Sequence, residues 1–349
     1  MKALVQDHYG NTGVLRLRDV ARPVPGPGEV VVRVHAAGVD PGVWHLTSGR
    51  PYLLRLLGFG LRAPKAPVRG VDFAGTVEET GDGVPDFRAG DEVFGTCEGA
   101  FAEYAVARAD LVSAKPARLS FEEAAAVAIS GCTALQALRD SGRVEPGQSV
   151  LVIGAAGGVG SFAVQLATAF GAKVTAVCST GKTDLVRELG ADHVVDYTLS
   201  DFTDRRYDLI VDTAGLRSLS HLRRALTPRG TLVIVGGEGG KWLGGVQRVV
   251  RAVLLNPFVR HRLRGLVTRV RSADLEVLRE TIEAGRLTPV LDRTYPFADA
   301  VTAIGYVHEG HSAGKVVRSE RRAGRTGDRG PRRAPGGAVG LTATARRCA

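Results

Sequence analysis

The sequence predicts an α/β fold in which a doubly wound parallel sheet stands beside a smaller, β-rich, barrel-like domain. Three observations carry this prediction. Short strands separated by glycine and proline fill the first 120 residues, a pattern typical of compact β domains. Strands and helices then alternate from residue 150 to about 235, as they do in parallel sheets. A glycine-rich turn stands between the first of those strands and the helix after it.

The β-rich domain is predicted over residues 1–122. Residues 1–22 alternate as strands around a turn, and a proline-rich loop then leads to a strand at 29–36. A loop with a short helix follows at 38–52. Further strands are expected at 68–77, 90–94 and 99–106. A helix and a short strand within 298–317 return to this domain, so we expect residues 293–318 to complete it.

The parallel sheet is predicted over residues 123–292. Its first helix begins after Ser120, which forms a capping-box pattern with Glu123. After the strand at 150–153, the further strands are expected at 173–178, 193–195, 207–212 and 230–235. Helices are expected at 183–189, 218–226 and 272–284.

The glycine-rich turn has the spacing of a dinucleotide-binding fingerprint. Ala155 takes the first glycine position, and Gly157 and Gly160 take the second and third. Backbone N–H groups at the positive end of a helix dipole bind pyrophosphate. The residues predicted to form this cradle are Ala155, Ala156, Gly157, Gly158, Val159 and Gly160.

Composition indicates a protein of the cytoplasm. The four cysteines lie far apart without metal-ligand spacing, so we interpret them as reduced thiols. The N-terminus lacks the pattern of a signal peptide, and no apolar run reaches membrane-spanning length.

Positive charge is concentrated in two segments. The arginine-rich tail, residues 319–349, carries a net charge of +6, and we expect it to be disordered. Residues 241–271 contain eight lysines and arginines, no acidic residue, and interleaved apolar side chains. Such a segment either lies on an anionic membrane surface or forms a helical pair that closes a cleft or contacts a second subunit. We favour the helical pair, because burial of one apolar face is the usual use of such a pattern.

Several stretches, in this order, resemble the medium-chain dehydrogenase/reductase superfamily, in its zinc-independent quinone oxidoreductase-like (enoyl reductase-type) branch. They are residues 38–41, 71–77, 87–95, 99–104, 155–160, 190–197 and 314–317. The resemblance covers roughly residues 1–318. It implies a GroES-like β-rich domain, a Rossmann domain that binds a nicotinamide cofactor, and a homodimer.

The resemblance also predicts that the site holds no metal. Zinc-dependent relatives carry cysteine where Asp40 stands, and a Gly-His-Glu motif where this chain has Gly70-Val71-Asp72. Without the thiolate and the imidazole, a catalytic zinc site with three protein ligands cannot form. The four-cysteine structural zinc lobe is missing as well.

NADPH is the predicted cofactor. The second strand of the parallel sheet ends at Cys178 without the acidic residue that binds NAD ribose, and Ser179, Thr180 and Lys182 follow. Hydroxyls and an ammonium donate to a 2′-phosphate, which an acid would repel. The alternative that Ser179 and Thr180 only cap the next helix stays open.

Further residues are expected around the cofactor. Gly236 and Gly237 end the fifth strand and would let the nicotinamide half pass close. The resemblance implies Tyr197 near the adenosine phosphate, Thr133 beside the nicotinamide, and Lys315 near the cofactor.

Hydride transfer without a metal suits an acceptor that delocalises the incoming charge, such as a quinone or an α,β-unsaturated carbonyl. Candidate donors to the developing oxyanion are His45 and Tyr52, with Trp44 a weaker third. Asp40, where relatives often carry asparagine, would hydrogen-bond a ribose or the substrate. His45 is equally explained as a surface or packing residue.

We therefore predict an NADPH-dependent reductase of a quinone or enone. One alternative is an enoyl-thioester reductase of the same superfamily. Another is an NADPH-binding protein that contacts RNA or a membrane surface with little turnover. Aromatic residues do not interleave with the C-terminal arginines, so we expect no specific nucleic-acid partner.

Overall fold

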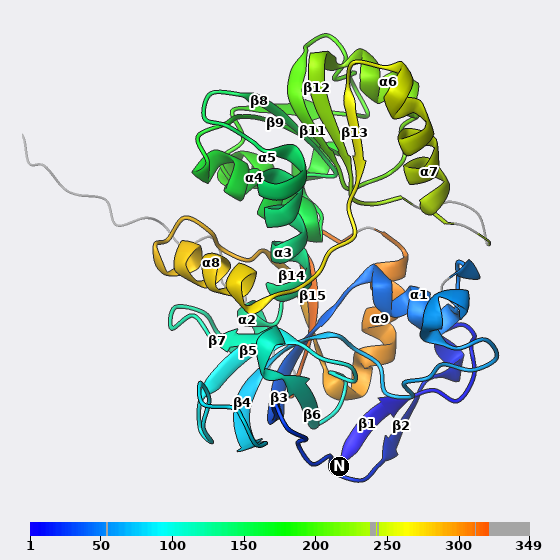
Figure 1. Ribbon diagram of the computed structural model, residues 1–349, viewed down its shortest axis with the longest axis vertical. Helices are drawn as coiled ribbons and strands as arrows, with labels where there is room; N and C mark the ends of the chain where they lie inside the picture. The colour runs from blue at the N-terminus through cyan, green and yellow to red at the C-terminus, as the bar shows by residue number, and fades with distance from the viewer. Residues whose placement is uncertain (54, 238–241, 243, 311, 321–349) are drawn as a thin grey trace, which may run out of the picture.

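The chain folds around two large β-sheets, one parallel and one mostly antiparallel (Figure 1). The computed structural model describes all residues except 54, 238–241, 243, 311 and 321–349. The prediction of an α/β fold with a doubly wound sheet is confirmed by the six-stranded parallel sheet. Among the described residues, no helix is long and apolar enough to cross a membrane.

The parallel sheet has the strand order β10-β9-β8-β11-β12-β13. Its strands are β8 (Ser149–Ile153), β9 (Lys173–Cys178), β10 (His193–Asp196), β11 (Tyr207–Asp212), β12 (Leu226–Ile234) and β13 (Arg262–Gly265). The helices and short turns between them are α4 (Gly158–Ala169), η5 (Thr180–Lys182), α5 (Thr183–Glu188), α6 (Leu219–Arg224), α7 (Val246–Leu255) and η6 (Asn256–Phe258). The chain runs outward from β8 in one direction and then from β11 in the other. The strand order therefore reverses between β8 and β11, and this place is called the switch point. Ligands of such sheets bind there, beside the carboxyl ends of the strands.

The second sheet has the order β14-β15-β3-β4-β5-β7, and β6 also pairs with β3. Its strands are β3 (Glu29–Val39), β4 (Asp72–Thr80), β5 (Glu92–Thr96), β6 (Tyr104–Arg108), β7 (Val112–Ala114), β14 (Leu291–Pro296) and β15 (Lys315–Ser319). A hairpin-like pair, β1 (Lys2–Val5) and β2 (Arg16–Asp19), stands apart. Near the C-terminus, β15 runs antiparallel to β3 and so returns the chain to the second sheet.

The remaining helices pack on the second sheet or lie between the two sheets (Figure 1). They are α1 (Pro41–Ser48), α2 (Phe121–Ala124), α3 (Ala128–Gln136), α8 (Ser272–Glu283) and α9 (Ala300–His308), with short turns at η1 (Thr12–Val14), η2 (Arg55–Phe59), η3 (Ala109–Leu111), η4 (Ala137–Gly142) and η7 (Phe297–Asp299). The small side chains of α3 are buried almost throughout, which lets it pack closely on α4 and α8. The predicted capping box at α2 is confirmed: Glu123 N donates to Ser120 Oγ at 3.2 Å, and Ser120 N donates to Glu123 Oε2 at 2.8 Å.

The helical pair predicted within residues 241–271 is wrong. Among the described residues of this segment, only α7 and the short turn η6 are helical, and residues 262–265 form β13 on the edge of the parallel sheet. Pro257 lacks the N–H that a continuing helix needs. The side chain of Asn256 then exchanges two hydrogen bonds with the backbone of Leu263, at 2.7 and 2.8 Å, which directs the chain back along β12.

The tail begins later than predicted. Ser319 belongs to β15, and the carboxylate of Glu320 lies 3.2 Å from the Arg33 guanidinium and 3.0 Å from His35 Nδ1. These contacts hold the first two residues of the predicted tail on the second sheet. The rest of that prediction, together with Cys348, lies outside the described residues.

Candidate cofactor and active site

The glycine-rich turn connects the carboxyl end of β8 to the start of α4. The N–H groups of Gly154 and Ala155 donate to the carbonyl of Val177, at 3.2 and 3.0 Å, which ties the turn to β9. Gly154 has a φ of +79°, so the left-handed tight turn falls on it, one residue before the position that we predicted from the fingerprint. Sequence reasoning missed Gly154, although it stands directly before the first residue of the fingerprint, Ala155.

The start of α4 fits a diphosphate. Its N-cap is Gly157, which offers no side-chain acceptor to the first N–H groups of the helix. A Cβ atom at Gly160 would lie 2.1 Å from the carbonyl oxygen of Gly154, so only glycine lets the helix begin this close to the strand. The uncapped N–H groups at the switch point are the kind of anion site that the sequence predicts.

The strand β15 meets this turn from the other sheet. Gly314 N donates to the carbonyl of Ala156 at 2.8 Å, and Gly157 and Gly314 form an isolated parallel bridge. The next residue, Lys315, then extends beneath Gly158: a Cβ atom there would lie 3.1 Å from Lys315 Cδ. Lys315 therefore lies directly against the predicted cofactor turn.

Lys315 is the centre of a buried charge cluster. Its Nζ donates to Ser130 Oγ at 3.1 Å, to Asp72 Oδ2 at 3.3 Å, and to Asp40 Oδ1. The side chains of Lys315 and Asp72 are 2% and 0% exposed. Of these four residues, Asp40 and Lys315 were predicted as site residues. Asp72 and Ser130 were missed, although a carboxylate inside the apolar strand at 71–77 is a signal of a buried charge.

The cluster holds two carboxylates and one ammonium. Burial, followed by the neighbouring charge of Asp40, raises the pKa of Asp72 well above its usual range. Burial alone would lower the pKa of Lys315, but the two carboxylates outweigh it and raise that pKa. Lys315 is therefore the cation that compensates the two acids, and the raised pKa of Asp72 reflects its burial beside Asp40.

The predicted adenosine site lies at the ends of β9 and β10. Thr180 Oγ1 lies 3.1 Å from Thr198 Oγ1, and Lys182 Nζ donates to the carbonyl of Ser312 at 2.8 Å. Tyr197 is about half exposed. Ser179 precedes η5 without capping it through its side chain. The structure thus brings these four predicted residues to one edge of the sheet.

An acid also lies at this edge. Asp196 ends β10 directly opposite Cys178, and hydrogen bonds from the hydroxyls of Thr180 and Thr198 lower its pKa. The prediction from the sequence considered only the end of β9, which has no acid. It missed Asp196, because that residue comes from the neighbouring strand. Its position indicates that Thr180 and Thr198 have a partner of their own besides any phosphate.

At the other side of the switch point, an ion pair fixes the ends of β11 and β12. Arg248 Nη2 donates to Asp212 Oδ2 at 2.7 Å, and Asp212 Oδ1 accepts from Gly215 N at 2.9 Å. Arg248 Nη1 also donates to the carbonyl of Gly236 at 3.4 Å, and Gly237 packs against Gly245 at the start of α7. Sequence reasoning missed this ion pair, because its partners are 36 residues apart.

Thr133 lies on α3, close to the charge cluster. Its hydroxyl donates to the carbonyl of Ile129 at 2.6 Å and lies 2.8 Å from Thr268 Oγ1. The residue is almost fully buried. Ile129 also donates its N–H to Asp72 Oδ1 at 3.1 Å, so α3 connects Thr133 to the cluster.

The three predicted catalytic residues do not form one group. Asp40 is the N-cap of α1 and belongs to the Lys315 cluster, whereas His45 Nδ1 donates to the carbonyl of Arg50 at 3.0 Å. Five residues along a helix turn the side chain by about 140°, which separates Asp40 from His45. The ring of Tyr52 lies edge-on to the ring of Trp242, with centroids 5.1 Å apart.

Trp44 is a packing residue. Its ring stacks on His308 of α9, with centroids 3.8 Å apart.

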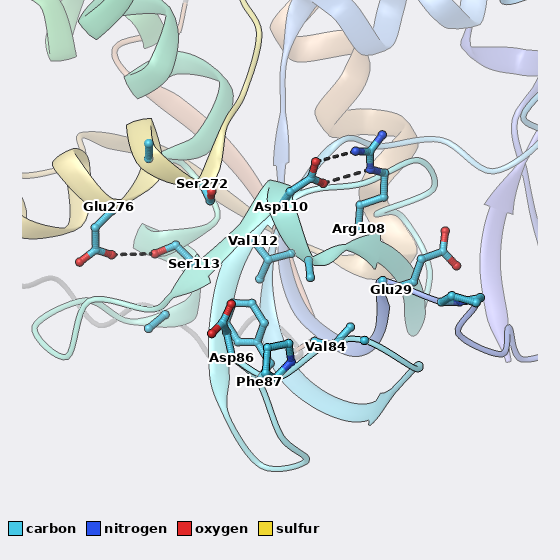
Figure 2. Close-up of a pocket in the computed structure, with 17 residues that line it drawn as sticks. Glu29, Val84, Asp86, Phe87, Arg108, Asp110, Val112, Ser113, Ser272 and Glu276 are labelled. Atoms are coloured by element: carbon cyan, nitrogen blue, oxygen red, sulfur yellow. Dashed lines mark hydrogen bonds and ion pairs between the residues drawn. The ribbon is translucent and has the colours of Figure 1, made fainter.

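A cavity of about 930 Å³ lies elsewhere, between β7, α8 and the loop around residues 83–87 (Figure 2). Two pairs of its polar side chains bind each other: Arg108 donates to Asp110, and Ser113 donates to Glu276 at 3.2 Å. None of the predicted site residues lines it. We therefore place the candidate site at the glycine-rich turn and not in this cavity.

Metal-ligating side chains do not gather in the described part of the chain. No group of three or more histidine, cysteine, aspartate or glutamate side chains there could hold a metal ion. Burial raises the pKa of the Cys97 and Cys132 thiols, so these cysteines are poor metal ligands.

Two family models match the chain. Residues 26–117 match the alcohol dehydrogenase GroES-like domain, and residues 189–317 match the model described as zinc-binding dehydrogenase. The first match confirms that the β-rich sheet belongs to a GroES-like domain.

Complete proteins match over almost their whole length. The chain is 32% identical to the chloroplast envelope quinone oxidoreductase homolog of Arabidopsis thaliana, over 91% of this chain and 98% of the relative. The structure of the quinone oxidoreductase from Coxiella burnetii has a TM-score of 0.82 and 29% identity, and covers 92% of this chain and 99% of its own. A mycobacterial protein solved in complex with NADPH has a TM-score of 0.77 and 28% identity, and covers 91% and 99%.

These matches agree with the fold and with the turn at the switch point. The second family model takes its description from zinc, but this chain has Asp40 and Val71 where the zinc-dependent relatives carry cysteine and histidine. The chain is an oxidoreductase that belongs to the medium-chain dehydrogenase/reductase superfamily, in its zinc-independent, quinone oxidoreductase-like branch.

Proposed function

We propose that this protein uses NADPH to reduce a quinone or an α,β-unsaturated carbonyl by direct hydride transfer, without a metal. The observation that carries the proposal is the uncapped start of α4 at Gly157, placed at the switch point and closed by Lys315 from the other sheet. The Arabidopsis relative is named a quinone oxidoreductase homolog, and the mycobacterial neighbour was solved with NADPH. Both names support this choice of acceptor and cofactor.

The residues of the chain have distinct tasks in this proposal. The first N–H groups of α4 bind the diphosphate, and Ser179, Thr180 and Lys182 donate to the 2′-phosphate. The nicotinamide, when bound, supplies a hydride. A donor then has to stabilise the oxyanion of the acceptor, and His45 and Tyr52 are the candidates for that hydrogen bond.

Oxidation of NADPH and NADH, followed by nicotinamide absorbance, tests the proposal. We expect turnover with a simple quinone or an enone, a kcat/KM about tenfold or more higher with NADPH than with NADH, and no change on addition of EDTA. A crotonyl thioester is included as a third acceptor. Loss of activity on chelation would overturn the metal-free mechanism. Preference for the thioester would identify an enoyl-thioester reductase, and tight NADPH binding without turnover would identify a binding protein.

Replacing Thr180 and Lys182 together by alanine is expected to remove the preference for NADPH. Hydrogen bonds to a charged group contribute about 1.5–3 kcal/mol each, so we expect KM for NADPH to rise at least about tenfold. KM for NADH, which has no 2′-phosphate, should change by less than about twofold.

The matched control is Lys173→Ala, an exposed lysine at the start of β9, the strand that leads to Thr180 and Lys182. It should leave both KM values unchanged. Equal increases of KM for NADPH and NADH in the double variant would show that the two side chains shape the turn and do not recognise the phosphate.

A further inference from the structure

Helix α7 exposes an apolar stripe to solvent. Its inward positions, Val249 and Ala252, pack into the core beneath the parallel sheet. The exposed apolar positions 246, 250, 253 and 254 recur at the spacing of one helix face, and Leu254 is 67% exposed. Just after the helix, Phe258 is 84% exposed. The helix is therefore apolar on two sides, and only one of them is used by the core.

A second apolar segment lies beside the start of α7. Leu53 N donates to the carbonyl of Trp242 at 3.1 Å, the ring of Tyr52 contacts the ring of Trp242, and Pro51 lies against Gly244. Figure 1 shows α1 and α7 along the same side of the molecule. We call the combined surface the apolar face. Its exposed side chains are Leu56, Leu57, Phe59, Leu61, Trp242, Val246, Val250, Val253, Leu254 and Phe258.

The two chain segments that build the apolar face are basic and contain no acids. No aspartate or glutamate occurs in residues 41–71 or 241–271, whereas the first segment has five lysines and arginines and the second has eight. Exposed members of this set include Arg62, Lys65, Arg251 and Arg260. A partner that covers the face therefore has to supply negative charge around an apolar centre.

The charge around the apolar face favours a lipid surface over a second copy of the chain as the partner that covers it. A two-fold dimer would place the same patch against itself and bring like charges together. An anionic bilayer offers acyl chains for leucine, phenylalanine and tryptophan, and phosphates for arginine and lysine. We propose that the apolar face docks on the surface of an anionic lipid bilayer, with α7 lying in the headgroup region.

This docking goes beyond the proposed function and does not depend on turnover. Tyr52 lies at the margin of the apolar face. An acceptor dissolved in the lipid would therefore arrive beside a candidate catalytic residue, a consequence that does rest on the proposed function.

Sedimentation of the full-length protein with lipid vesicles tests the docking. We expect the protein to sediment with vesicles of phosphatidylcholine and phosphatidylglycerol, less with phosphatidylcholine alone, and less at high salt. The double variant Leu254→Ser/Phe258→Ser should lower the partition coefficient on the anionic vesicles about tenfold, because it removes two large side chains from the buried apolar area.

Val24→Ser is the matched control, since Val24 is 78% exposed in the loop between β2 and β3. It should bind vesicles like the unmodified protein. The arginine-rich tail is unchanged in every variant. If the double variant sediments as well as the unmodified protein, binding comes from the tail or from another surface, and the proposal is wrong.

Sedimentation velocity without vesicles tests whether a second copy of the chain, and not a lipid surface, covers the apolar face. A second copy on the apolar face would make the double variant smaller than the unmodified protein, while neither would bind vesicles; that result would overturn the proposal. A dimer held by another surface would keep its size in the variant. NADPH affinity and the melting temperature should not change, because both replaced side chains are exposed and neither is among the residues predicted to bind the cofactor.

Discussion

Replacing Lys315 by methionine should lower the free energy of unfolding by about 3–5 kcal/mol at neutral pH. Methionine fills a similar volume but leaves the buried Asp72 and the partly buried Asp40 together with no cation. Removing one partner of a buried ion pair is costly, because the remaining charge loses its compensation while it stays out of water. Denaturation by urea at about pH 5 and about pH 8 measures the loss.

The loss should depend on pH in a defined direction. In the folded protein the pKa of Asp72 is already raised above its ordinary value of 3.8, and loss of the ammonium raises it further. A carboxyl with a raised folded pKa contributes stability that is present below its unfolded pKa and is lost as pH rises through the folded value. The deficit of Lys315→Met is therefore larger at pH 8 than at pH 5. The contribution of Lys315 itself, whose folded pKa is raised, disappears only above its unfolded value of about 10.5.

The double variant Lys315→Met/Asp72→Asn provides the check. Asparagine keeps an acceptor for the N–H of Ile129 and removes one carboxylate, so part of the stability should return. Lys173→Met, on an exposed lysine, should cost less than about 0.5 kcal/mol. A loss under about 1 kcal/mol that is the same at both pH values would show that the cluster is not an ionic one.

The local pattern of apolar residues is sufficient to predict a strand that is buried on both faces. The segments 173–178 and 207–212 were predicted with the bounds that β9 and β11 have, since runs of apolar residues ended by polar ones are typical of parallel strands. Strand β13 has the opposite pattern: Leu263 is its one buried residue, between two exposed arginines. Its pairing with β12 and the side chain of Asn256 decide that structure, and neither is visible in the local sequence.

The charge cluster shows the same limit within the site. Asp40 follows Val39, whose partner across the sheet is Val316, and Lys315 precedes Val316. On the other side of β3, Ala37 pairs with Phe73, which places Asp72 next to the same point. Strand register therefore brings the three charges together, although 275 residues separate Asp40 from Lys315. The turn at Gly157 could be predicted because all of its residues are adjacent. The oxyanion donor could not, because it depends on how a substrate lies between His45 and Tyr52.

Breaking the buried ion pair between Arg248 and Asp212 should destabilise the protein as much as breaking the Lys315 cluster. Arg248→Leu leaves Asp212, which is fully buried, with the N–H of Gly215 as its remaining hydrogen-bond donor. We expect a loss of about 3–5 kcal/mol in the free energy of unfolding, measured by urea denaturation. Arg251→Leu, an exposed position one turn along α7, should stay within about 0.5 kcal/mol of the unmodified protein.

A double-mutant cycle with Asp212→Asn distinguishes the ion pair from simple packing of α7. Asparagine still accepts from Gly215 but carries no charge, so Arg248→Leu should cost much less in that background than alone. Purely additive losses would contradict the electrostatic account. Because Arg248 also donates to the carbonyl of Gly236, its removal frees the turn that the nicotinamide half of the cofactor is predicted to pass. The affinity for NADPH should therefore fall together with stability in Arg248→Leu and recover with it in the double variant, whereas a change in stability alone would place the cofactor away from Gly236.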